Sequence, residues 1–131
     1  MDADRRQAVR WRIAVPVQYC ISSVPEGRQS QCTGQTEDLS MCGARIVTST
    51  PCSLGDCLGL VLGIPGTSKK PIKVEAKVVW RKDVPVSQEG CNYMAGIEFN
   101  NFKEYNKRSL LGYVSAAHPQ EFTKNWWQGI R

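Results

Sequence analysis

Apolar and polar residues alternate along much of this chain with a period of two, which indicates β-strands with one buried face. The pattern is clearest over residues 72–81, where charged residues occupy one predicted face. The other predicted face is apolar: Ile72, Val74, Ala76, Val78 and Trp80. We therefore expect this segment to be a strand with the whole apolar set, Trp80 included, on one side.

The same alternation predicts five further strands. They lie near residues 15–21, 31–39, 44–48, 58–64 and 93–99. Pro16 indicates that the first lies at a sheet edge or begins there, because proline cannot donate a ladder hydrogen bond. The second is polar, so we expect it to be exposed. Six short strands separated by turns predict an antiparallel barrel or sandwich, and closing the barrel would pair every strand edge.

After residue 100 the apolar spacing changes to that of a helix. Asn101 and Glu104 are spaced as a capping box, which marks a helix start. One predicted face is apolar: Phe102, Tyr105, Leu110, Leu111 and Val114. We expect this helix to pack across the barrel and to end at His118-Pro119. In the tail that follows, Trp126 and Trp127 either dock onto the barrel or form a surface for a partner.

Composition places the chain among soluble single domains. It has 131 residues, 41% apolar and 22% charged. The net charge of +5 favours an anionic partner without choosing among nucleic acid, nucleotide, acidic protein and lipid headgroup. Residues 1–6 lack the apolar stretch of a secretory signal, and no apolar run reaches the roughly 18 residues of a membrane span. We expect a cytoplasmic protein.

Metal binding and catalysis find little support in the sequence. The six cysteines include no CxxC pair, and the single His118 has no ligand partner at helical spacing. We therefore expect that the protein binds no metal and that its thiols are reduced. We expect most of the cysteines to be buried, and a redox role for Cys42 or Cys91 stays open. No nucleophile lies beside a base, and no glycine-rich phosphate loop is present, so we expect no enzyme activity and no cofactor.

Two short motifs carry the best chemical signal. Arg6 and Arg10 form an RxxxR arrangement before the first strand, and Asp38, Ser40 and Gly43 form a DxSxxG arrangement before the third. Taken singly, the first fits a solvated basic leader. The second fits a tight turn in which Asp and Ser bond backbone amides and Gly supplies a positive φ.

Together and in this order, the two motifs resemble the signature of PilZ domains. The segments Val78–Trp80 and Gly96–Phe99 and the helix that follows are also similar to that family, from about residue 4 to about 116. The resemblance implies a mainly β protein: a six-stranded antiparallel barrel with a carboxy-terminal helix. We expect a flexible arginine-rich leader over residues 1–12, the barrel and helix over 13–117, and a tail over 118–131.

The resemblance also implies that the barrel binds cyclic di-GMP on its outer surface. The implied ligand-binding residues are Arg5, Arg6, Arg10, Asp38, Ser40, Gly43 and Trp80. Guanidinium groups suit phosphates and guanine edges, a carboxylate suits guanine N–H donors, and an indole can stack on a base. Ser40 and amides near Gly43 would donate to a phosphate. Arg5 would favour a stacked ligand dimer.

The first twelve residues carry four arginines and few apolar groups, so we expect them to act as a switch: ligand binding would fold this leader over the barrel, and a partner protein would read the new surface. One alternative is a PilZ-like adaptor that binds no nucleotide. Another is a small nucleic-acid-binding barrel similar to an OB-fold, which the positive charge and four tryptophans favour. Such binders place aromatic and basic residues together on one strand face, whereas here the aromatic residues follow the apolar face.

Overall fold

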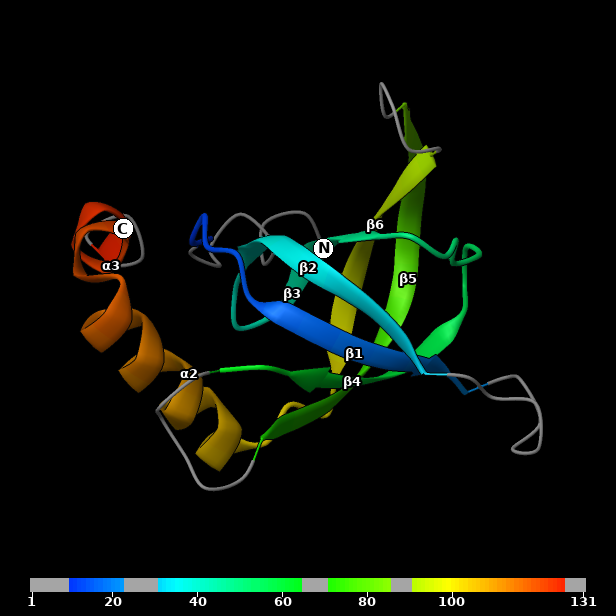
Figure 1. Ribbon diagram of the computed structural model, residues 1–131. Coiled ribbons are helices and arrows are strands. Elements are labelled where there is room, and N and C mark those ends of the chain that lie inside the picture. Colours follow the sequence, from blue (N-terminus) through cyan, green and yellow to red (C-terminus); the bar gives the residue numbers. More distant parts are fainter. Residues whose placement is uncertain (1–9, 23–30, 65–70, 86–90, 127–131) are drawn as a thin grey trace.

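The computed structural model describes residues 10–22, 31–64, 71–85 and 91–126 and contains six strands followed by two helices (Figure 1). The strands are β1 (Pro16–Ile21), β2 (Cys32–Leu39), β3 (Gly43–Thr48), β4 (Cys57–Leu62), β5 (Ile72–Pro85) and β6 (Cys91–Asn100). The helices are α2 (Glu104–Ala117) and α3 (Pro119–Trp126).

The strands close into an antiparallel barrel in the order β1-β2-β3-β6-β5-β4. Each strand is hydrogen-bonded to two neighbours, and β1 pairs with β4 to complete the ring. This confirms the predicted six-stranded barrel with a carboxy-terminal helix. β5 and β6 extend beyond the ring as a two-stranded hairpin, because β4 pairs with β5 only as far as Lys77 while β6 pairs with it to Pro85.

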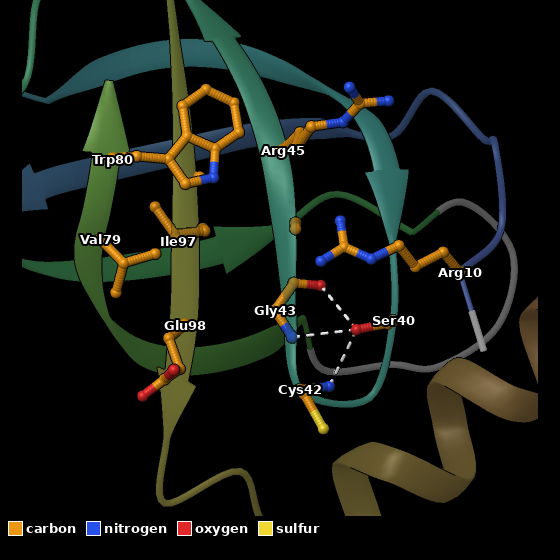
Figure 2. Close-up of a pocket in the computed structure, with 11 residues that line it drawn as sticks. Arg10, Ser40, Cys42, Gly43, Arg45, Val79, Trp80, Ile97 and Glu98 are labelled. Atoms are coloured by element: carbon orange, nitrogen blue, oxygen red, sulfur yellow. Dashed lines mark hydrogen bonds between the residues drawn. The ribbon is translucent and has the colours of Figure 1, made fainter. Parts of the chain in front are cut away.

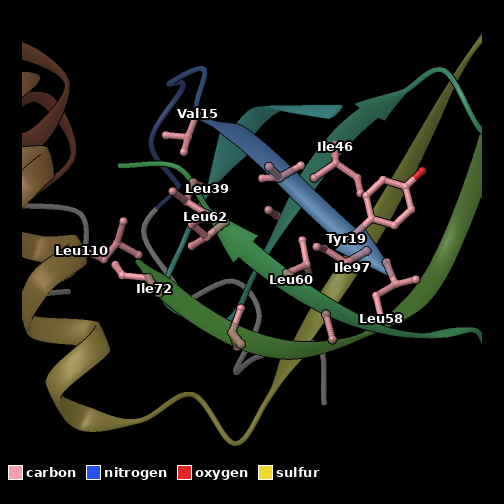
Figure 3. Close-up of a cluster of buried hydrophobic side chains, with 14 of the residues drawn as sticks. Val15, Tyr19, Leu39, Ile46, Leu58, Leu60, Leu62, Ile72, Ile97 and Leu110 are labelled. Atoms are coloured by element: carbon pink, nitrogen blue, oxygen red, sulfur yellow. The ribbon is translucent and has the colours of Figure 1, made fainter. Parts of the chain in front are cut away.

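Alternate positions along the strands fill the barrel interior (Figure 3). Branched aliphatic side chains dominate this core, and the largest of them are fully buried: Leu39, Ile46, Leu58, Leu60 and Leu62. Burying each such side chain stabilises the fold by about 1.5–3 kcal/mol. Leu110 of α2 lies beside Ile72 at one end of the barrel, so the helix contributes to the same core.

The second strand is less exposed than its polar sequence predicts. Thr36, Asp38 and Leu39 are all buried. The Thr36 hydroxyl donates to the Ile13 carbonyl at 2.7 Å and accepts the Val15 N–H at 2.8 Å. Buried polar groups persist where they have such partners. The prediction that β2 is exposed is therefore wrong for the second half of the strand. That half binds the segment that precedes β1 through these hydrogen bonds.

That segment is held to the barrel from Trp11 onward. Trp11 and Leu39 exchange two backbone hydrogen bonds of 2.9 Å, and Trp11 is only 4% exposed. The Arg12 N–H donates to a Glu121 carboxylate oxygen of α3 at 2.9 Å. Residues 11 and 12, which we expected to belong to the flexible leader, are thus part of the folded barrel. Residues 1–9 lie outside the described residues.

The first helix starts later than predicted and buries only part of the predicted face, with Leu110 and Val114 buried as expected. Its N-cap is Lys103, without a side-chain capping bond, so the Asn101–Glu104 capping box is wrong. The residues it buries are Asn106, Leu110, Tyr113 and Val114. Two residues of the predicted apolar face are exposed: Tyr105 and Leu111. Polar Asn106 is buried because its side-chain amide donates to the Lys73 carbonyl at 3.2 Å.

The end of α2 at His118 confirms the predicted stop, and the expected tail begins with a second helix, α3. The His118 ring contacts Tyr113, with 3.1 Å between the Tyr113 hydroxyl and Nε2. Phe122 of α3 packs against the core, which anchors this helix. Neither tryptophan of the predicted tail can be placed, because the Trp126 side chain and all of Trp127 lie outside the described residues.

Cysteine burial also differs from expectation. Of the five cysteines whose side chains the structure describes, only Cys52 is buried, whereas Cys42 and Cys57 are exposed. Burial raises the pKa of the Cys52 thiol, which keeps it in the unreactive protonated form. Within the described ranges, no group of three or more His, Cys, Asp or Glu side chains could hold a metal ion. No described helix is long and apolar enough to cross a membrane.

Tyr19 makes stability sensitive to alkaline pH. Its side chain is 1% exposed and its hydroxyl donates to the Thr50 carbonyl at 2.9 Å. Burial raises the pKa of this phenol above its ordinary value near 10. Between the ordinary and the raised pKa the unfolded chain loses the proton while the folded chain keeps it, so stability falls as pH rises past about 10.

Urea unfolding of the protein and of a Tyr19→Phe variant between pH 8 and 11 tests this effect. The free energy of unfolding of the protein should fall more steeply above pH 10 than that of the variant, which has no phenol to ionise. Equal slopes for the two proteins would contradict the assignment.

Candidate functional site

A shallow pocket lies on the outer surface of the barrel where β3 passes between β2 and the β5–β6 pair (Figure 2). Four residues expected from the sequence line it: Arg10, Ser40, Gly43 and Trp80. Its volume is about 80 Å³, whereas pockets that enclose a small-molecule ligand measure about 300–1,000 Å³. The described residues therefore form one wall of a site and do not enclose a ligand.

Asp38 lies beneath this surface and holds two arginines. Its carboxylate accepts hydrogen bonds from Arg45 Nε at 2.6 Å and from the Arg45 N–H at 3.3 Å. It also accepts a longer bond, 3.4 Å, from Arg10 Nη1. The Asp38 side chain is only 6% exposed, whereas those of Arg10 and Arg45 are 55% and 37% exposed. The buried carboxylate therefore positions two partly exposed cations.

Arg45 lies in this pocket although the sequence analysis did not select it. It sits directly opposite Asp38 in the pairing of β2 with β3. Residues that face each other across antiparallel strands lie close enough for their side chains to interact. The register of these two strands would have identified Arg45, but the order of residues along the chain gives no register.

Ser40 shapes the turn between β2 and β3. Its hydroxyl oxygen accepts the N–H groups of Cys42 and Gly43, each at 3.1 Å, and its hydrogen is donated to the Gly43 carbonyl at 3.2 Å. The Ser40 N–H also donates to that carbonyl, at 2.8 Å. This network fixes the turn and uses the single hydroxyl hydrogen. Donation from Ser40 to a phosphate stays a prediction.

Gly43 is needed for close strand packing and not for a positive φ. Among described glycines only Gly55 has a positive φ, so the expectation for Gly43 is wrong. A Cβ at Gly43 would collide with the carbonyl oxygen of Ile97 on the neighbouring strand β6. The motif glycine therefore allows β3 and β6 to approach each other beneath the pocket.

Trp80 faces outward, contrary to the predicted alternation. Val78 is 1% exposed and faces the core, whereas Trp80 is 38% exposed and lines the pocket. The pairing of β5 with β6 shifts between these two residues, with Val79 as the extra residue. Such a bulge turns the following side chain to the other face. The predicted inward face of Trp80 is therefore wrong, and its expected place at the binding surface is retained.

The remaining two predicted site residues, Arg5 and Arg6, lie outside the described residues. Glu98, which the sequence analysis did not select, is exposed and also lines the pocket. The described surface thus combines two guanidinium groups, an indole and one carboxylate. These groups match an anionic ligand that also has an aromatic ring.

Comparison with known proteins identifies the family. The PilZ domain family model matches residues 4–116. The chain therefore belongs to the PilZ domain family. No curated protein matches its sequence.

Solved structures share the fold at low sequence identity. The inhibitor of motility MotI/DgrA of Bacillus subtilis is 22% identical with a TM-score of 0.65, covering 89% of this chain and 52% of that one. The PilZ domain with c-di-GMP of YcgR from Escherichia coli is 14% identical with a TM-score of 0.68, covering 92% and 96%. The K. pneumonia MrkH–c-di-GMP complex is 18% identical with a TM-score of 0.65, covering 88% and 55%.

Two of these neighbours are thus complexes with c-di-GMP. The chain spans about half the length of the Bacillus and K. pneumonia proteins and nearly all of the Escherichia coli domain. At these identities the likeness shows a shared PilZ fold.

Proposed function

We propose that this protein is a receptor for cyclic di-GMP. The observation that carries the proposal is that one outer face of the barrel brings together Arg10 of RxxxR, the DxSxxG turn and Trp80. These elements are far apart in the sequence and meet only because β3 lies between β2 and β6. Membership of the PilZ family and the c-di-GMP complexes of YcgR and MrkH support the same ligand.

The chemistry of the pocket suits the two halves of this ligand. Arg10 and Arg45 carry guanidinium groups on the side of β3 toward β2, where they can bind phosphate oxygens or the O6 and N7 atoms of guanine. Trp80 lies on the side of β3 toward β5, where its indole can stack on a guanine. The ligand would therefore lie across β3, with charged and aromatic contacts at opposite ends.

The proposal assigns the rest of the site to the leader. The pocket of the described residues is too small to enclose a dinucleotide, so Arg5 and Arg6 would supply the remaining cationic contacts. Ordering this segment costs conformational entropy, which charge-assisted hydrogen bonds to phosphates offset. The closed leader would present a new surface to a partner protein in the cytoplasm. Arg5 would favour a stacked ligand dimer.

Isothermal titration with cyclic di-GMP tests the proposal. We expect saturable binding to the protein, and a loss of about 10- to 100-fold in affinity for Arg6→Ala and for Arg10→Ala, since each removes hydrogen bonds to a charged group. Arg12→Ala is the matched control, because Arg12 is an exposed arginine close to Arg10 in the sequence that does not line the pocket. Two ligands per chain would support the stacked dimer.

Two results would replace this function with another. No binding at high ligand concentration would leave an adaptor of PilZ fold, whose partner protein would then be the target of study. Binding to generic oligonucleotides that weakens steeply with salt would indicate a nucleic-acid-binding barrel. Limited proteolysis tests the switch: absence of ligand-dependent protection near residues 6–12 would exclude closure of the leader.

A further inference from the structure

The Trp80 indole lies flat against a strand position that has no side chain. Trp80 pairs directly with Gly96 of β6. The three atoms nearest to a Cβ built at Gly96 all belong to that indole: Nε1, Cε2 and Cδ1. All three would be inside van der Waals contact. The ring therefore occupies the space that any other residue at position 96 would need.

The indole remains accessible on its other side. Trp80 is 38% exposed, and both it and Gly96 line the pocket. The bulge at Val79 turns the Trp80 side chain outward. Because Gly96 has no side chain, the indole packs against the sheet there instead of projecting into solvent. A large ring supported on one face and open on the other is preorganised for stacking, which reduces the entropy lost when a ligand binds.

We propose that Gly96 is a positioning residue of the ligand site, which acts by holding the Trp80 indole flat so that a purine base of the ligand stacks on its exposed face. The proposal rests on the proposed function and adds to it the residue that sets the orientation of the ring. Gly96 itself makes no contact with the base. Its contribution passes entirely through Trp80.

Substitution of Gly96 by valine tests the proposal. Valine favours strands, so the backbone of β6 should tolerate it, while its side chain forces the indole out of its place. We expect Gly96→Val to weaken cyclic di-GMP binding by about 5- to 100-fold, the range that loss of one base–aromatic stack produces. Trp80→Ala should weaken it by a similar factor. Adding Gly96→Val to Trp80→Ala should cause no further loss.

A second measurement separates ring orientation from general damage to the fold. Stacking on an indole shifts the guanine H8 resonance of the bound ligand, and this shift should be lost in Gly96→Val as it is in Trp80→Ala. Gly59→Val is the matched control, because Gly59 is a barrel-strand glycine with open space at its Cβ position. It should retain both the affinity and the shift.

The outcomes distinguish this inference from the proposed function. If the unmodified protein does not bind cyclic di-GMP, the function itself fails. If it binds and Gly96→Val binds equally well with the H8 shift unchanged, the positioning role of Gly96 is wrong. A further loss in the double variant beyond Trp80→Ala alone would also contradict it, since Gly96 would then act by another route.

Discussion

Replacing Asp38 by alanine is expected to reduce the affinity for cyclic di-GMP more than replacing either arginine that it holds. One buried carboxylate orients both Arg10 and Arg45, so its loss releases two guanidinium groups at once. Hydrogen bonds to charged groups contribute about 1.5–3 kcal/mol each. The expected loss for Asp38→Ala is therefore about 3–6 kcal/mol, measured by titration calorimetry.

The arginine variants show whether Asp38 acts in this way. Arg45→Ala alone should cost about half as much binding free energy as Asp38→Ala, which would show that Arg45 contacts the ligand. Asp83→Ala is the matched control, because Asp83 also pairs with an arginine but is 67% exposed and lies outside the pocket. Unchanged affinity for Asp38→Ala in a folded protein would exclude the carboxylate from the site.

The largest effect on stability is expected at Gly43. An alanine there would place its Cβ against the Ile97 carbonyl of β6, and neither backbone can move without disturbing the barrel. Overpacking costs about 1–3 kcal/mol, and a collision with backbone belongs at the upper end. We expect a fall in melting temperature of roughly 10 °C for a domain of this size, measured by circular dichroism.

Gly59→Ala is the comparison that isolates this cause. Both glycines lie in barrel strands, but a Cβ at Gly59 meets no atom within 4 Å. It should therefore leave the melting temperature unchanged or raise it slightly, because alanine loses less backbone entropy than glycine on folding. A similar fall for both variants would show that close packing of β3 on β6 is not the reason for glycine at position 43.

The sequence was sufficient to predict the barrel because alternation is a local property. In β4 and in the first half of β5, every second residue faces the core, as predicted. The exceptions arise where tertiary structure breaks the period. The bulge at Val79 turns the Trp80 side chain from the core face to the outer face. The hydrogen bond from Asn106 to the Lys73 carbonyl allows a polar residue of α2 to be buried, which an apolar pattern does not predict.

The candidate site was predictable only in part, for a related reason. Arg10, Asp38 and Trp80 belong to segments that resemble a known family, so they could be selected from the chain alone. Arg45 and Gly96 could not, since each owes its place to a partner on a neighbouring strand. Contacts of that kind depend on register, and register is set by the whole barrel.

The pair of backbone bonds between Trp11 and Leu39 gives the leader a fixed point of attachment. Arg6 precedes Trp11 by five residues, and an extended chain spans at most about 3.6 Å per residue. Its Cα therefore stays within about 18 Å of the attachment. A short tether of this kind keeps its groups at a high effective concentration near the pocket. A variant that breaks the Trp11–Leu39 bonds would lengthen this tether. It would lower the effective concentration of the leader arginines near the pocket while leaving their side chains unchanged.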